Sequence, residues 1–188
     1  MLILASASPR RRELLTQIGL HFEVIPAHID ETPRAAEDPA TYVQRLALEK
    51  AHALQELYPH AIILGADTTV VLDGVALNKP ASRADAERML RSLSGRTHQV
   101  QTGLALLSPT TRRTHLETTA VTFAPIAEAD LEHYLNTPDP YDKAGAYGIQ
   151  GYAARWIPRI EGDYFNVMGL PLAATIHLLR ELSYSEST

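Results

Sequence analysis

Short apolar runs alternate with amphipathic stretches along the chain, which predicts strands alternating with helices. The predicted strands are Leu2–Ala5, Phe22–Pro26, Ala61–Ala66, Gln99–Leu107, His115–Phe123 and Trp156–Ile160. The predicted helices run from Ser8-Pro9 to Gly19, from Asp38-Pro39 to about Tyr58, and over Ser82–Leu93, Ala127–Leu135 and Leu172–Leu182. Asp73-Gly74 predicts a hairpin turn and Tyr141–Gly151 a glycine-punctuated loop. This order of elements indicates an α/β fold, a mixed twisted sheet flanked by helices.

Composition narrows the class of protein. The 188 residues predict a single domain, residues 1–188, with 45% hydrophobic and 21% charged residues, as in ordinary globular proteins. Because cysteine is absent, disulfides, cysteine zinc sites, iron–sulfur clusters and thiol nucleophiles are excluded. The net charge of −5 argues against a nucleic-acid partner, and no apolar run is long enough to span a membrane. We therefore expect a cytoplasmic protein.

A cationic motif lies between the first strand and the first helix. Arg10, Arg11 and Arg12 follow Ser8-Pro9, where Ser8 is placed to cap the helix and Pro9 to occupy its first position. Cations are unfavourable at a helix N-terminus, whereas anions bind there. The motif therefore predicts an anion site, the alternative being arginines that simply solvate the first turn.

Charged residues also interrupt two apolar patterns. Lys50 falls within the apolar stripe of the second helix, so its amine must either reach solvent or meet a buried negative charge. Asp67 follows the most apolar strand, at the end where open α/β sheets place ligand crevices. A carboxylate there binds a metal, a cation or a proton, or else it caps a turn. Two further charged segments, Asp30-Glu31 and Asn78-Lys79-Pro80, follow other strands.

Acids and cations together indicate a polyphosphate held with a divalent metal, whereas cations alone would indicate plain phosphate capture. The loop Asp142–Gly151 has a composition suited to packing its backbone against a flat ligand. Within it, Gln150 carries both a donor and an acceptor, as needed to recognise the edge of a base. The alternative for this loop is a structural turn around a buried tyrosine.

The ordered motifs resemble those of the Maf family of nucleoside triphosphate pyrophosphatases, over residues 2 to about 182. The motifs that carry the resemblance are Ser6-Ala7-Ser8-Pro9-Arg10-Arg11, Arg45-Leu46-Ala47-Leu48-Glu49-Lys50-Ala51, Gly65-Ala66-Asp67-Thr68, Asn78-Lys79-Pro80, Ser94-Gly95-Arg96-Thr97-His98 and Asp142–Gly151. The last loop resembles the branch that hydrolyses dTTP and UTP. Two departures lie at the edge of the expected pocket: Thr69, where an aliphatic residue is common, and Asn78, where Gly or Glu is usual.

The resemblance implies a hydrolase of phosphoric anhydride bonds that cleaves between the α- and β-phosphates. Its implied fold is Maf/ITPase-like, a mixed α/β sheet in two lobes with the site in a central cleft, in a homodimer. Asp67 would be the general base and would share a divalent metal, Mg²⁺ or Mn²⁺, with Glu31. The implied phosphate-binding residues are Ser8, Arg11, Lys50 and Lys79, and the implied base-selecting residues are Arg10, Thr68 and Gln150.

The sequence thus predicts a pyrophosphatase for dTTP and UTP, with modified pyrimidine nucleotides as further expected substrates. One alternative is a pyrophosphatase for another base, such as 7-methyl-GTP or CTP. Another is a nucleotide-binding regulator of cell division with little turnover. Asp67 separates the two classes, because a sensor needs the cations whereas only an enzyme needs an acid beside the reacting phosphorus.

Overall fold

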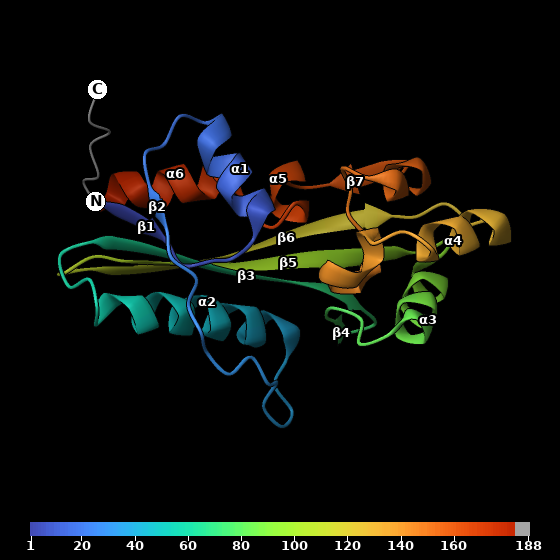
Figure 1. Cartoon of the computed structure of the whole chain (residues 1–188), viewed down its shortest axis with the longest axis horizontal. Helices are drawn as coiled ribbons and strands as arrows, with labels where there is room; N and C mark the ends of the chain where they lie inside the picture. Colours follow the sequence, from blue (N-terminus) through green and yellow to red (C-terminus); the bar gives the residue numbers. More distant parts are fainter. Residues whose placement is uncertain (183–188) are drawn as a thin grey trace.

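A seven-stranded mixed sheet forms the spine of the computed structural model, which describes residues 1–182 (Figure 1). Its strands are β1 (Leu2–Leu4), β2 (Glu23–Val24), β3 (Ile62–Leu72), β4 (Val75–Leu77), β5 (Thr97–Leu107), β6 (Arg112–Thr122) and β7 (Arg159–Glu161). Their order is β2-β1-β3-β5-β6-β7, with β4 paired to the far end of β3. β1 is parallel to β2 and β3, and the other pairs are antiparallel. The predicted mixed sheet is confirmed; residues 183–188 of the predicted domain lie outside the described residues.

Helices cover both faces of this sheet. They are α1 (Pro9–Gln17), α2 (Pro39–Gln55), α3 (Arg83–Leu93), α4 (Glu128–Leu135), α5 (Tyr164–Val167) and α6 (Leu172–Glu181), with 3-10 turns at Asp139–Asp142, Ala144–Ala146 and Tyr152–Trp156. Ser8 and Asp38 accept backbone N–H bonds at the starts of α1 and α2, and proline follows each cap, as predicted. α2 lies on one face of the sheet, and α1 and α6 lie on the other (Figure 1).

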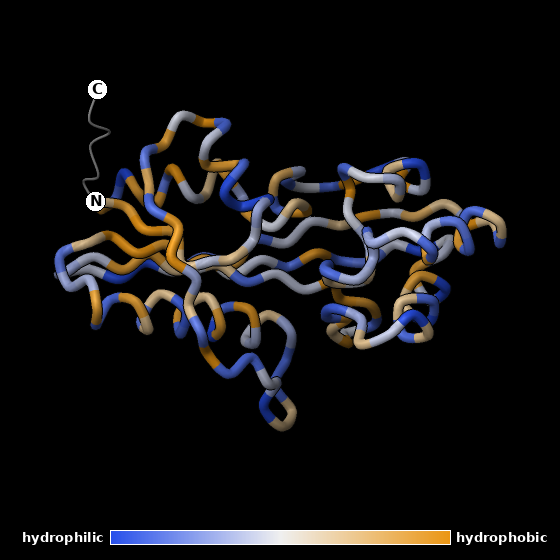
Figure 2. Tube along the Cα trace, in the orientation of Figure 1, coloured by the Kyte–Doolittle hydropathy of each residue, from blue (hydrophilic) through white to orange (hydrophobic). Residues whose placement is uncertain are grey.

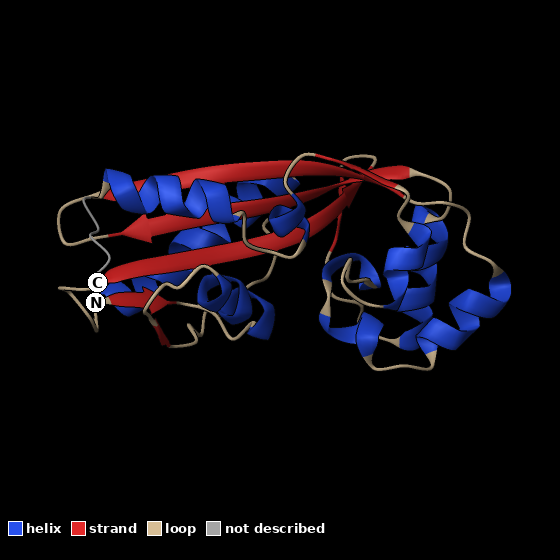
Figure 3. Cartoon of the chain, turned by 90° about the horizontal axis from the view of Figure 1, so that it is seen from above, coloured by secondary structure: helices blue, strands red, loops and turns tan. Residues whose placement is uncertain are grey.

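The molecule has two lobes that share the long strands β3, β5 and β6 (Figure 3). In the first lobe the sheet is sandwiched between α2 and the pair α1 and α6. In the second lobe α3, α4 and the 3-10 turns surround a core that contains Leu90, Phe123, Tyr134 and Trp156. The sequence-based expectation of two lobes is confirmed.

Two glycines let α2 lie directly on the sheet. A Cβ added at Gly65 of β3 would be 2.1 Å from the carbonyl oxygen of Ala47, and one at Gly103 of β5 would be 2.4 Å from that of Val43. Neither position tolerates a side chain without a shift of the helix backbone. This close packing sets the distance between α2 and β3. It therefore also sets the position of Lys50 relative to Asp67.

Several predicted elements differ from the structure; the strand predicted to begin at His115, for example, begins at Arg112. β3 continues six residues beyond Ala66 to Leu72, because Asp67, Thr68 and Thr69 remain extended and paired with β5 although they end the apolar run. The last predicted strand, Trp156–Ile160, is wrong in place: Trp156 ends a 3-10 turn and β7 begins at Arg159. The second helix ends at Gln55, and Leu57, expected in its apolar stripe, is 70% exposed.

Hydropathy follows the layers of the fold. Figure 2 shows β1 as a continuously apolar segment, consistent with the complete burial of its residues between the two helical layers. Over the described residues, no helix combines the length and the hydropathy that a membrane crossing requires.

Candidate active site

A pocket of about 760 Å³ opens between the two lobes. Its wall comes from the start of α1, from α2, from β3, from the turn after β4 and from residues 139–151. This volume lies in the range typical of sites for small molecules and cofactors. The pocket contains every site residue that the sequence predicted: Ser8, Arg10, Arg11, Glu31, Lys50, Asp67, Thr68, Lys79 and Gln150.

The pocket lies where the edge of β3 has no neighbouring strand. β1 pairs with β3 up to Leu64, and β4 joins it from Val70 onward, so the segment between them is open on that side. Asp67 lies within this gap, in the middle of β3. The prediction that it follows the end of the strand is therefore wrong. The predicted crevice nevertheless forms here, because the short parallel strand β1 ends beside it.

Asp67 and Glu31 share the ammonium of Lys50. Lys50 Nζ lies 2.7 Å from Oδ1 of Asp67 and 2.8 Å from Oε1 of Glu31. Lys50 and Asp67 are buried, whereas the Glu31 side chain is 52% exposed. Of the two roles that the sequence left open for Lys50, the structure supports the buried ion pair.

Burial and charge act against each other on Asp67. Burial raises the pKa of Asp67 above its usual value, while the charges of Lys50 and Arg11 oppose this rise. Burial alone would also raise the pKa of Glu31, but its bond to Lys50 brings the net shift below the usual value. The more buried of the two carboxylates is therefore the better proton acceptor.

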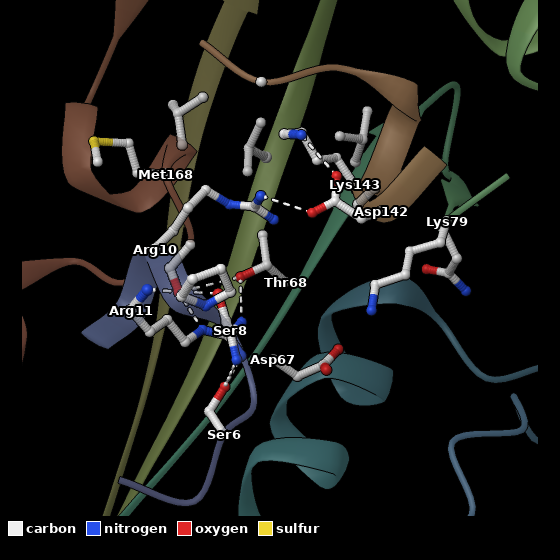
Figure 4. A pocket seen from close by; sticks show the side chains of 18 of the residues that line it. Ser6, Ser8, Arg10, Arg11, Asp67, Thr68, Lys79, Asp142, Lys143 and Met168 are labelled. Carbon is white, nitrogen blue, oxygen red and sulfur yellow. Dashed lines mark hydrogen bonds and ion pairs between the residues drawn. The ribbon is translucent and has the colours of Figure 1, made fainter. Parts of the chain in front are cut away.

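The buried guanidinium of Arg11 joins α1 to β3 and to the segment after α5. It donates to the carbonyl oxygen of Gly169 at 2.8 Å, to that of Ala66 at 2.9 Å, and to Oγ1 of Thr68 at 3.0 Å. It also donates to Oγ of Ser6 at 3.2 Å. The bond to Ala66 satisfies the open edge of β3. Arg11 is thus held rigidly beneath the start of α1, as Figure 4 shows.

The start of α1 lines the pocket. Ser8 caps the helix, and its first turn contains no acidic residue. Arg10 extends across the pocket mouth and pairs with Asp142 at 3.2 Å, which links the two lobes (Figure 4). Asp142 also binds Lys143 Nζ at 2.6 Å. The anion site predicted from the arginine motif has the required helix end and cations, while anion binding itself stays a prediction.

Lys79 and Gln150 are exposed at the pocket wall. Figure 4 shows Lys79 and Arg11 on opposite sides of Asp67. Within residues 1–182, neither Lys79 nor Gln150 has a side-chain hydrogen bond or ion pair with another residue. Both side chains are therefore available to a ligand.

The two residues that depart from the family pattern contact each other. Oγ1 of Thr69 donates to Oδ1 of Asn78 at 2.7 Å, and Nδ2 of Asn78 lies 3.5 Å from the hydroxyl of Tyr42. Tyr42 in turn donates to the backbone carbonyl of Glu31 at 3.0 Å. Burial and the neighbouring carboxylates Asp67 and Glu31 raise the pKa of Tyr42 to about 12, so it stays protonated. Sequence analysis missed Tyr42, because an aromatic residue beside an apolar stripe gives no signal of its own.

A second pair that the sequence did not reveal supports the loop carrying Gln150. Nε2 of His98 lies 2.7 Å from the hydroxyl of Tyr147, and both residues are buried. Burial lowers the pKa of His98 to about 4, so its ring is neutral. The sequence motifs Ser94–His98 and Asp142–Gly151 each contain one of these two residues. Their contact could not be predicted, because it depends on the fold.

Asp67 and Glu31 are the residues that would hold the metal predicted from the sequence. The described residues contain no cluster of three or more His, Cys, Asp or Glu side chains able to hold a metal. Mg²⁺, however, is commonly bound by one or two carboxylates together with substrate phosphates and water. Asp67 and Glu31 provide two such carboxylates around one cation position, which Lys50 Nζ occupies here.

Known proteins resemble this chain over nearly its whole length. A family model described as "Maf-like protein" matches residues 1–182. Proteins named dTTP/UTP pyrophosphatase from Koribacter versatilis and Symbiobacterium thermophilum are 53% and 54% identical; the alignments cover 95% and 97% of this chain and 93% and 94% of theirs. The structure of a HAM1 protein from Coxiella burnetii is similar in fold, with a TM-score of 0.56 at 16% identity, over 96% of this chain and 98% of that one.

Proposed function

The chain belongs to the Maf-like protein family, and we propose that it hydrolyses dTTP and UTP to the nucleoside monophosphate and pyrophosphate. It is thus a hydrolase of a phosphoric anhydride bond. Relatives that carry this activity in their names match nearly the full length of the chain.

One observation carries the chemical part of the proposal. Asp67 is a buried carboxylate whose Oδ1 is held by Lys50, and none of the described residues donates a hydrogen bond to its Oδ2. Oδ2 is therefore free to accept the proton of an attacking water. The raised pKa of Asp67 makes it a stronger base than an exposed aspartate. A nucleotide sensor would have no use for a carboxylate beside the phosphates, because it repels them.

The cations around Asp67 are proposed to hold the triphosphate. The helix end at Ser8 and the charge of Arg11 act on one side of the pocket, and the exposed amine of Lys79 acts on the other. Lys50 screens Asp67 and Glu31 from the phosphate charge. Since the donors of Arg11 already bind the protein, its contribution is the electrostatic field and the support of Thr68.

Base selection is assigned to Arg10, Thr68 and Gln150. Gln150 has both a donor and an acceptor unused, as the edge of a thymine or uracil base requires. Arg10, in the first turn of α1, is held by Asp142 of the second lobe. All three residues line the same pocket, where a base would meet their side chains.

We also propose that Mg²⁺ or Mn²⁺ enters with the nucleotide and is held by Asp67 and Glu31. When bound, the ion lowers the pKa of coordinated water and offsets negative charge on the phosphates. A cytoplasmic location and a homodimer complete the proposal. Size-exclusion chromatography with light scattering tests the dimer.

A panel of nucleoside triphosphates tests the function. The purified protein is incubated with dTTP, UTP, CTP, GTP, ATP and 7-methyl-GTP in Mg²⁺ or Mn²⁺, with and without added inorganic pyrophosphatase. We expect phosphate only when that enzyme is present, and most strongly from dTTP and UTP. No product from any nucleotide, together with tight nucleotide binding by calorimetry, would favour the regulator.

A further inference from the structure

Glu31 lies on a long segment that contains neither helix nor strand. β2 ends at Val24 and α2 begins at Pro39, so residues 25–38 cross the pocket side of the sheet as an irregular loop. Loops of this length without regular structure are commonly functional, but they need attachments to hold one conformation. The position of the Glu31 carboxylate beside Lys50 therefore depends on what fastens this loop.

Arg45 of α2 makes three hydrogen bonds to the loop. Its guanidinium binds both oxygens of Glu37, with Nε 2.6 Å from Oε1 and Nη2 2.7 Å from Oε2. Nη2 also donates to the backbone carbonyl of Thr32 at 3.2 Å. Two points of the loop, immediately after Glu31 and near the start of α2, are thus fixed to one side chain. We call the pair of Arg45 and Glu37 the loop clip.

The loop clip has the features of a strong ion pair. The side chains of Arg45 and Glu37 are only 11% and 5% exposed, and the contact is bidentate. Arg45 lowers the pKa of Glu37 to about 2, so the pair stays charged throughout the range in which the protein can be assayed. Nη1 of Arg45 also forms an ion pair with Oε2 of Glu49, one turn further along α2, at 3.1 Å.

The other polar contacts of the loop are weaker, and Ile29 adds apolar packing against α2. Arg34 pairs with Glu49 at 3.0 Å, but its side chain is 67% exposed, and such pairs contribute little. The hydroxyl of Tyr42 binds the backbone of Glu31 through a single hydrogen bond. Half-exposed Glu31 itself cannot order the loop through its one contact with Lys50.

We propose that Arg45 is a positioning residue, which through the loop clip holds the carboxylate of Glu31 against Lys50 in the active site. Arg45 acts on the reaction through Glu31 and touches neither Asp67 nor Lys50. The proposal rests on the proposed hydrolysis for its kinetic consequence, whereas its structural consequence, order in residues 26–37, is independent of it.

Three variants test the loop clip. Arg45→Met keeps the length and packing of the side chain but removes its bonds, Arg45→Lys keeps the charge, and Glu37→Gln weakens the pair from the loop side. Amide hydrogen exchange and the kcat and KM for dTTP are measured for each, for Glu31→Gln, and for the double variant Arg45→Met/Glu31→Gln. Arg113→Met is the matched control, because it breaks the exposed pair between Arg113 and Glu181, far from the pocket.

We expect Arg45→Met to speed exchange in residues 26–37 while β3 and β5 stay protected, and to lower kcat/KM about 10- to 100-fold. Glu37→Gln should act in the same direction, and Arg45→Lys should recover part of the loss. In the double variant the loss should equal that of Glu31→Gln alone, because Arg45 acts through Glu31.

Unchanged exchange in residues 26–37 of Arg45→Met and Glu37→Gln would overturn the proposal. So would losses that multiply in the double variant, because Arg45 would then act independently of Glu31. If the unmodified protein hydrolyses no nucleotide, the proposed function fails, and the exchange data still decide whether the loop clip orders the Glu31 loop.

Discussion

Lys50 Nζ lies 2.7 Å from Oδ1 of Asp67, and this contact joins a helix to the middle of a strand inside the active site. Both side chains are about nine-tenths buried, so each charge depends on the other for compensation. The same ammonium lies 2.8 Å from Glu31. Lys50 is therefore the charge around which the two carboxylates are organised.

Lys50→Met should destabilise the protein in a pH-dependent manner. Removing the ammonium raises the pKa of Asp67 further, above its usual value near 3.8. A carboxyl with a raised pKa in the folded state favours folding at low pH, and this contribution is lost as the pH rises through that pKa. We expect the deficit in unfolding free energy relative to the unmodified protein to grow from pH 5 to pH 8, where it reaches about 3 kcal/mol.

Urea unfolding at the two pH values measures this deficit. Lys79→Met is the matched control: Lys79 is exposed without an ion pair to any described residue, so its loss should change the unfolding free energy by less than about 0.5 kcal/mol. A deficit for Lys50→Met that is constant between pH 5 and pH 8 would mean that Asp67 does not depend on Lys50.

Gln150→Ala should change which base the enzyme prefers. Losing a base-reading hydrogen bond should lower the preference of kcat/KM for dTTP over a purine triphosphate by about tenfold. The turnover of the best remaining substrate should fall less. Gln17→Ala, at the exposed end of α1, is the control and should leave the preference unchanged. Equal losses for every nucleotide would make Gln150 a structural residue.

Gly65→Ala should disturb the fold and the site together. The added methyl group would lie 2.1 Å from the carbonyl oxygen of Ala47, so α2 must move away from β3. We expect a loss of about 3 kcal/mol in unfolding free energy and reduced activity, because Lys50 moves with the helix. Gly103→Ala should behave similarly. Unfolding midpoints equal to that of the unmodified protein would show that α2 can yield without cost.

His98→Gln should make stability less sensitive to acid. The folded protein keeps His98 neutral down to about pH 4, whereas the unfolded chain binds a proton near pH 6.5, so stability falls as the pH drops through this window. Between pH 7.5 and pH 5.0 the unmodified protein should lose about 2 kcal/mol more than His98→Gln. Replacing the exposed His60 by Gln should leave the loss unchanged, and an equal loss in His98→Gln would contradict the buried neutral ring.

The sequence predicts the elements well where one pattern decides them. The helix starts at Ser8-Pro9 and Asp38-Pro39 follow from capping, and the hairpin at Asp73-Gly74 from its turn residues. The predicted β3 is too short, because Asp67, Thr68 and Thr69 break the apolar run, and the first two of them line the pocket. A strand that enters a binding site has no reason to stay apolar, so its end cannot be located from hydropathy.

The sequence predicted which residues form the site but not which of them contact each other. Charges within apolar patterns identified Lys50 and Asp67, because burial of an unpaired charge is costly. The cationic motif at the start of the first helix identified Arg11. The contact between His98 and Tyr147 joins residues that are distant in the sequence. Nothing in either local segment signals such a partner, since the fold alone brings them together.

The most direct test of the central claim compares Asp67→Asn with the unmodified protein on dTTP. Thymidine monophosphate and pyrophosphate are quantified, and dTTP binding is measured by calorimetry, with Asp73→Asn on the exposed hairpin turn as the control. For the unmodified protein and for the control, we predict one pyrophosphate for each monophosphate formed. Asp67→Asn should bind dTTP but turn over at least about 100-fold more slowly. Turnover in Asp67→Asn within a few fold of the unmodified protein would contradict the assignment of Asp67 as the base.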